Sequence, residues 1–99
     1  MLKDKYSFTV TPVTADTILH GIHSRINEKS ERAHFLCVLC LDKFCQKLIL
    51  TIHRPGKVSR KISLNKMEQL AMHIGYKEGY FDTNNIFIQE IFTAIDKTL

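Results

Sequence analysis

The sequence predicts an α+β fold, in which helices pack against an antiparallel β-sheet. Residues 6–10 alternate between apolar and polar side chains and are rich in strand-forming residues, which is typical of a half-buried strand. Residues 35–41 form an uninterrupted apolar run of the length expected for a central strand. Between residues 64 and 74, by contrast, apolar side chains recur at the spacing of one helical face. Together these segments indicate an α+β domain.

The chain is expected to form a single domain over residues 1–99, because 99 residues are too few for two hydrophobic cores. A content of 44% hydrophobic and 24% charged residues is typical of an ordinary soluble domain. No apolar run approaches the ~20 residues of a membrane-spanning helix, and the charged N-terminus does not resemble a signal peptide. We therefore expect a cytoplasmic protein without membrane contact, and the odd number of cysteines favours free thiols.

The first strand is expected to lead into a helix. Pro12 ends the strand or marks a sheet edge, and Thr14 is suited to cap the helix that follows, which is expected to reach about Glu28. The apolar stripe of this helix consists of Ala15, Ile18, Leu19, Ile22 and Ile26.

The segment 34–52 allows two interpretations. Several of its apolar residues fit helical spacing, which would make it a helix. Its short apolar runs and the turn-like pair Asp42-Lys43 instead favour two strands, at 35–41 and 48–52. The strand interpretation is preferred because it explains the segment with short loops.

A third strand is expected after a turn. Pro55 and Gly56 occupy the central positions of that turn, and residues 58–64 alternate between apolar and polar side chains. A three-strand antiparallel meander therefore follows the first helix in this prediction.

Two helices are expected to complete the chain. Ser63 is suited to cap a helix over 64–74, which Gly75 would end, and Thr83 or Asn84 would start the last helix. The predicted order is β-α-β-β-β-α-α, with the N-terminal strand and the meander in one sheet packed by three helices.

The last helix carries more apolar side chains than contact with one sheet face requires. Part of this arc is therefore expected to meet a second subunit, which would make the protein a homodimer. The predicted interface residues are Phe87, Ile88, Ile91, Phe92 and Ile95.

Positive charge is concentrated in the middle of the chain. Residues 43–67 contain seven Lys or Arg and no acid, whereas the residues from Glu68 onward contain five acids and two lysines. A basic hairpin at 47–66 is thus a candidate for binding an anionic partner, either nucleic acid or an acidic protein surface. Its candidate contact residues are Lys47, Arg54, Lys57, Arg60, Lys61 and Lys66. The alternative is a solvated hairpin whose charges prevent edge-to-edge aggregation.

A histidine and three cysteines lie close together, in the pattern His34-x2-Cys37-x2-Cys40-x4-Cys45. Thiolates and an imidazole could bind zinc, but on a strand Cys37 and Cys40 point to opposite faces. The prediction is therefore buried structural thiols, with no metal and no cofactor. The metal alternative would return if the segment were helical.

No catalytic motif is present, and the acidic residues are scattered singly. His20 and His23 lie three residues apart on the polar face of the first helix, where solvated histidines are the simplest interpretation. The protein is therefore predicted not to be an enzyme, and a small histidine-dependent enzyme has no supporting constellation.

One segment resembles a known family. The residues Leu70-Ala71-x2-Ile74-Gly75-Tyr76, followed by Tyr80-Phe81, resemble the helix-turn-helix of AraC-type regulators, over residues 63–81. The resemblance implies that Ala71 packs under a second helix, that Gly75 turns the chain and that the aromatics anchor a recognition helix. Past Phe81 the chain has Asp82-Thr83-Asn84-Asn85, where that family has basic residues and an apolar anchor.

Two functions follow from these patterns. The first is a small, non-enzymatic regulatory or accessory protein that binds DNA or RNA through the basic hairpin. The second is a protein-interaction module, or a small inhibitor or subunit, that docks on a larger complex through its basic face and its apolar last helix.

Overall fold

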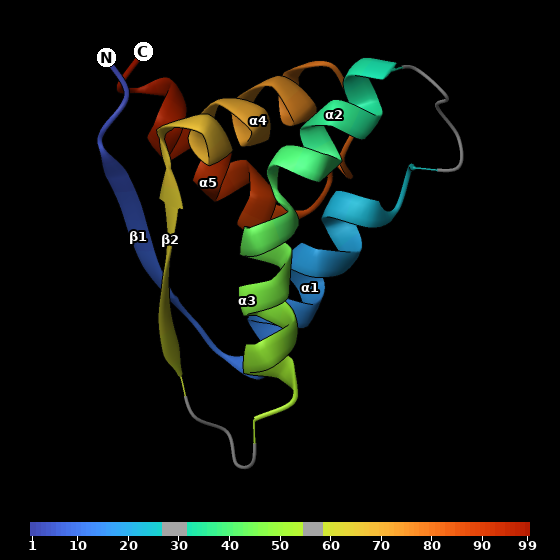
Figure 1. Ribbon diagram of the computed structural model, residues 1–99, viewed down its shortest axis with the longest axis vertical. Helices are drawn as coiled ribbons and strands as arrows, with labels where there is room; N and C mark the ends of the chain where they lie inside the picture. The colour runs from blue at the N-terminus through green and yellow to red at the C-terminus, as the bar shows by residue number, and fades with distance from the viewer. Residues whose placement is uncertain (27–31, 55–58) are drawn as a thin grey trace.

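The structure confirms the α+β class but contains more helix than the sequence predicts. The computed structural model describes residues 1–26, 32–54 and 59–99. None of the helices in these ranges is long and apolar enough to cross a membrane. The elements, labelled in Figure 1, are β1 (Lys5–Val10), α1 (Pro12–His23), α2 (Arg32–Cys40), α3 (Asp42–Ile52), β2 (Arg60–Asn65), α4 (Lys66–Lys77) and α5 (Ile86–Asp96).

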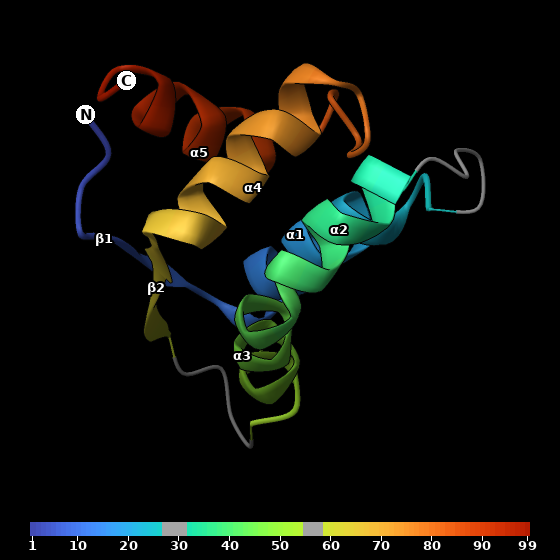
Figure 2. The ribbon, with the colours of Figure 1, turned by 45° about the horizontal axis from the view of Figure 1, so that its top comes forward.

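β1 and β2 form a two-stranded antiparallel sheet, although they lie far apart in the sequence. Lys5 pairs with Asn65 at one end, and Val10 pairs with Arg60 at the other. The sheet lies at one edge of the molecule in both views, with α3 in contact with β2 (Figures 1 and 2). The two chain ends lie close together, where the Met1 amino group donates a hydrogen bond to the carbonyl of Thr98.

The predicted strands at 35–41 and 48–52 are wrong, because these segments are helical and belong to α2 and α3. The buried side chains of α3 recur every three or four residues, which collects them on one side of a helix but would divide them between the two faces of a strand. They are Phe44, Cys45, Leu48 and Thr51. The burial of this stripe therefore outweighs the strand-forming character of the sequence.

The predicted three-strand meander and the order β-α-β-β-β-α-α are wrong as well. β2 pairs with β1, not with a preceding hairpin strand. The pair Asp42-Lys43, predicted as a turn, begins α3 directly after α2. The predicted turn at Pro55-Gly56 lies outside the described residues. The predicted basic hairpin at 47–66 is thus replaced, in its described part, by the end of α3 and by β2.

The first helix begins earlier than predicted. Pro12 is its first residue, and the Thr11 side chain accepts a hydrogen bond from the N–H of Thr14 at 3.1 Å. Thr11 is therefore the N-cap, and proline is favoured at the first helical position because its missing N–H would have no partner there. The helix ends at His23, and the predicted end at Glu28 lies outside the described residues.

α4 is held at its start by a capping box, not by the predicted Ser63 cap. The Asn65 side chain accepts a hydrogen bond from the N–H of Glu68, and the Glu68 carboxylate accepts one from the N–H of Asn65, both at 2.8 Å. This reciprocal pair satisfies two backbone donors at the junction between β2 and α4. Ser63 itself lies within β2.

Gly75 lies inside α4, not at its end as predicted. A Cβ at Gly75 would stand 2.3 Å from two carbons of the Phe81 ring, so a glycine is needed for this ring to pack against the helix. Gly79 adopts the left-handed conformation, with φ of 72°, just after the end of the helix. The chain thus turns at Gly79 and folds Phe81 back onto Gly75.

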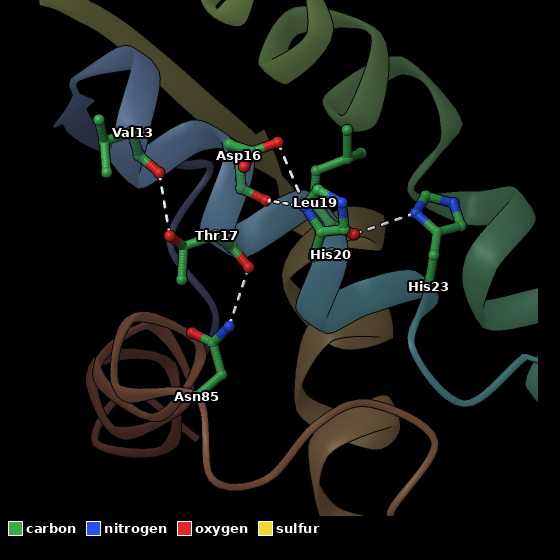
Figure 3. A network of polar contacts seen from close by, with 7 residues as sticks. All are labelled: Val13, Asp16, Thr17, Leu19, His20, His23 and Asn85. Atoms are coloured by element: carbon green, nitrogen blue, oxygen red, sulfur yellow. Dashed lines mark hydrogen bonds and ion pairs between the residues drawn. The ribbon is translucent and has the colours of Figure 1, made fainter.

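The start of α5 packs closely against α1. A Cβ at Gly21 would lie 2.5 Å from Cδ1 of Ile88, so the absence of a side chain permits this contact. The Asn85 side chain accepts hydrogen bonds from the first N–H groups of α5 and donates one to the carbonyl of Thr17 at 2.9 Å (Figure 3). Asn85 therefore caps α5 and ties it to α1 at the same time.

Candidate functional site

Five basic side chains lie on or just after α3 and at the start of β2. Lys43, Lys47 and Arg54 are spaced by four and seven residues, which places them along the same side of α3 and its extension. Arg60 and Lys61 are the first residues of β2 and point to opposite faces of that strand. We call these five residues the basic region.

The two elements of the basic region adjoin each other. α3 and β2 are in contact, and the end of α3 lies at the same end of the molecule as the beginning of β2 (Figure 1). The charged stripe of α3 therefore leads toward the first residues of β2. Helix and strand together bring into one region four of the cations that the sequence assigned to a hairpin, which are Lys47, Arg54, Arg60 and Lys61.

None of these five cations forms an ion pair with a described residue. The acidic residue of α3 is Asp42, whose carboxylate accepts a hydrogen bond from the Gln46 side chain at 2.8 Å. Lys66 differs, because it opens α4 and pairs with Asp4 at 3.2 Å. Lys57 lies outside the described residues.

No family model, curated protein or solved structure matches this chain. Its function is therefore inferred from the chemistry of its own residues. Besides the basic region, the features that bear on function are the predicted interface on the last helix, an exposed apolar surface, and the histidines and cysteines.

The predicted interface on the last helix lies largely in the core, which corrects the prediction. Three of its residues are at most 3% exposed; they are Ile88, Ile91 and Ile95. Phe87 is half-buried, and the Phe92 ring stacks on that of Tyr76 with 4.2 Å between centroids. The apolar arc is wide because α5 packs against both α1 and α4, so most of it is not available to a second subunit.

A different apolar surface is exposed, on α2 and α4. Leu36 and Leu39 of α2 are 59% and 67% exposed, and Met67, Leu70 and Ile74 of α4 are 66%, 43% and 39% exposed. We call these five residues the apolar face. The sequence prediction missed this surface because a strand over 35–41 places successive side chains on opposite faces, whereas a helix exposes Leu36 and Leu39 on one side.

A groove of about 270 Å³ runs between the two helices. On each helix its lining follows the spacing i, i+3, i+4, i+7, from Ala33 to Cys40 on α2 and from Met67 to Ile74 on α4. The buried side chains of Cys37 and Ala71 lie at its floor. Small residues at the floor and larger ones at the rim make this surface concave.

Cys37 and Cys45 are buried, as predicted, whereas Cys40 is exposed, which corrects that part of the prediction. Helix α2 brings Cys37 and Cys40 to neighbouring positions, as the metal alternative requires. Even so, no group of three or more His, Cys, Asp or Glu side chains among the described residues could hold a metal ion. Burial raises the pKa of the Cys37 thiol and raises the pKa of Cys45 to about 12. Both shifts disfavour the thiolate that metals and nucleophilic chemistry need.

His34 is a fully buried side chain that packs against an aromatic ring. Within the described parts of the chain, neither ring nitrogen has a hydrogen-bond partner. Its ring stacks on that of Tyr80, with 4.9 Å between centroids and 5° between planes. His34 thus behaves as an aromatic packing residue that joins the start of α2 to the turn after α4.

His20 and His23 of α1 each turn back onto their own helix, as Figure 3 shows. Nδ1 of His20 donates to the carbonyl of Asp16 at 2.9 Å and lies 3.2 Å from the Asp16 carboxylate. Nδ1 of His23 donates to the carbonyl of Leu19 at 3.1 Å. One nitrogen of each ring is therefore engaged by the helix.

A histidine–aspartate pair that the sequence did not predict joins α4 to α5. Nε2 of His73 lies 2.9 Å from an oxygen of Asp96, and the His73 ring stacks on Phe92 at 4.7 Å. The two partners come from separate helices and are 23 residues apart in the sequence, so no local motif indicates the pair. In the described structure their polar and ring contacts join one helix to the other, which is a structural role.

The segment that resembles a helix-turn-helix corresponds to α4 and the chain leading to α5. Residues 78–85 connect these helices, which is longer than the three- or four-residue turn typical of that motif. Exposed side chains near and on α5 include Glu90 and Asp96, which oppose contact with phosphates. α5 is therefore poorly suited to be a recognition helix.

Proposed function

We propose that this protein is a non-enzymatic nucleic-acid-binding protein that contacts the phosphate backbone of a duplex through the basic region. The observation that carries the proposal is a set of five cations on two adjoining elements, none paired with a described acid. A cation already bonded to a carboxylate must exchange that contact for a phosphate. An unpaired one is available without this cost.

The dimensions of the basic region suit a duplex. The stripe from Lys43 to Arg54 extends roughly 16 Å at the ~1.5 Å rise of a helical residue. This length corresponds to about five base pairs at ~3.4 Å each. Cations distributed along it could contact several successive phosphates.

The side chains beside the cations favour a duplex over a single strand. Proteins that hold single strands stack the bases on exposed aromatic rings. The aromatic residue of α3 is Phe44, which is fully buried, and β2 contains none. The proposed binding is therefore dominated by the phosphate backbone and depends little on sequence.

The test measures binding of a fluorescent duplex at several salt concentrations. For the parent, we expect log K to fall with log salt by about 0.9 per phosphate contact. The triple variant Lys47→Gln, Arg54→Gln, Lys61→Gln is expected to bind more weakly, with a slope smaller by about 2.7, which is three contacts at ~0.9 each.

A second triple variant controls for net charge. Lys3→Gln, Lys77→Gln and Lys97→Gln remove as many charges from elsewhere in the chain and are expected to leave the slope close to that of the parent. Equal loss in both variants would show non-specific attraction by net charge alone. Absence of parent binding at ~50 mM salt would exclude the proposal. A single strand of the same length serves as the second arm and is expected to bind less tightly than the duplex.

A further inference from the structure

The apolar face on α2 and α4 has no partner among the described residues. Its five side chains are aliphatic or thioether groups, exposed by 39–67%. Single exposed apolar residues are common, whereas these five lie together on a helix pair and form a patch of the kind that interaction sites use. The groove between the helices gives this patch a shape that another helix pair could fill.

The size of the face suits a second copy of the chain in weak association. Burying an aliphatic side chain removes on the order of 100 Å² from water, so five half-exposed ones would bury roughly 250–300 Å² per copy. If polar atoms make up ~40% of the interface area, the two copies together would bury about 900 Å² of accessible surface. This lies at the lower edge of the ~1,000 Å² that stable interfaces need, which implies an association that depends on concentration.

The charges at the two ends of α2 complement each other under twofold symmetry. α2 begins at Arg32 and is followed by Asp42, and both side chains are exposed. If two copies place their α2 helices antiparallel across a twofold axis, each Arg32 faces the Asp42 of the other copy. One self-complementary patch then supplies both halves of the interface, as a twofold dimer requires.

The geometry points to a homodimer in which the apolar faces of two copies pack together, with α2 antiparallel to α2 across the twofold axis. This inference goes beyond the proposed function, because the residues of the apolar face are distinct from those of the basic region. The apolar face thereby takes the place of the last helix as the site of dimerisation, because most apolar side chains of that helix are buried in the core.

The test is sedimentation equilibrium of the full chain from ~1 μM to ~1 mM, where dissociation constants of weak complexes fall. We expect a monomer–dimer equilibrium with a dissociation constant of roughly 10–100 μM. The variant Leu36→Glu, Leu70→Glu places charges on two exposed positions and is expected to weaken association at least tenfold. The control Ile86→Glu changes an apolar residue of α5 that is 64% exposed and is expected to dimerise as the parent does.

A charge exchange tests the antiparallel arrangement. Arg32→Asp alone and Asp42→Arg alone are expected to weaken the dimer, and the double variant is expected to restore it. A parent that stays monomeric at ~1 mM would overturn the inference and leave the face to a different polypeptide. A dimer unaffected by Leu36→Glu, Leu70→Glu would overturn it as well. The two proposals fail independently, because sedimentation of the chain alone reports the dimer, whereas the salt dependence of duplex binding reports the basic region.

Discussion

His34 is a polar residue in a purely apolar role. Both of its ring nitrogens are buried and lack partners within the described structure, and an unsatisfied buried polar group costs about 1–3 kcal/mol. The parallel stack on Tyr80 recovers part of that cost through ring contact. His34 is therefore a position at which the shape of the ring matters more than its nitrogens.

Replacing His34 by phenylalanine should stabilise the protein. The variant keeps a flat ring against Tyr80 and removes two polar atoms without partners, so we expect the free energy of unfolding to rise by about 1 kcal/mol. The control His34→Ala removes the ring as well and should lower it by about 2–4 kcal/mol. Urea unfolding followed by circular dichroism measures both. A loss of stability in His34→Phe would mean that a ring nitrogen is bonded in solution.

At the scale of elements, α4 and the following turn depend on one close contact. Gly75 admits the buried ring of Phe81, which folds back after the turn at Gly79. Glycine lowers helix propensity by ~1 kcal/mol relative to alanine. A glycine within a helix is therefore unfavourable by propensity but is required here by packing.

The substitution Gly75→Ala should destabilise the protein despite the better helix propensity of alanine. The new Cβ would meet two ring carbons at 2.3 Å, and the resulting overpacking should exceed the propensity gain and cost about 1–3 kcal/mol net. The matched control is Thr93→Ala, at an exposed position of α5, which should leave stability unchanged or raise it slightly. Thermal unfolding of the three proteins gives the comparison. A Gly75→Ala protein more stable than the parent would show that Phe81 has room to move.

The elements that the sequence predicted well carry their own local signals. β1 alternates with period two, α1 and α4 each have an apolar stripe, and α5 starts after a polar cap, so each could be placed within a few residues. The segment 34–52 failed because α2 exposes Leu36 and Leu39. With apolar residues on several sides, that helix resembles a buried strand, and the periodicity that separates the two interpretations is lost.

Long-range contacts explain the rest of the difference. β2 pairs with β1, which is far away in the sequence, and no local pattern indicates this pairing. The turn residues Pro55 and Gly56 instead indicated a hairpin between β2 and the segment just before it. The cations of the candidate site could be chosen from the sequence because an acid-free stretch is visible there. Their placement on α3 and β2, and the relevance of Lys43, required the helix, which puts Lys43, Lys47 and Arg54 on one side.

At the scale of the whole molecule, the pKa values of three groups that lose a proton in alkali are raised, and two of these groups are buried while the third is half-buried. Burial raises the pKa of Tyr6, with a contribution from Glu90, and raises that of Cys37. Burial raises the pKa of Cys45 from 9.0 to about 12. The folded protein holds these protons at a pH at which the unfolded chain releases them. The unfolded state then binds fewer protons, so the free energy of unfolding falls as the pH rises.

Cys45 should therefore contribute to alkaline unfolding. Its contribution to the free energy of unfolding is fully present below about pH 9 and is lost progressively toward about pH 12. The difference between the two pKa values corresponds to a loss of at most about 4 kcal/mol in the free energy of unfolding. The measurement is urea unfolding at several values between about pH 8 and pH 11. Cys45→Ala should be less stable than the parent near neutral pH, because it leaves a small cavity, but should lose less stability across this range.

Cys40→Ala provides the control for the loss of a thiol. Cys40 is exposed, so its replacement should leave the pH dependence of the parent unchanged. If the curves of the parent and Cys45→Ala ran parallel up to about pH 11, the Cys45 thiol would have the same pKa in both states. If the free energy of unfolding fell less steeply with pH in Cys45→Ala but not in Cys40→Ala, part of the destabilisation in alkali would come from the core, where the Cys45 side chain of α3 is buried.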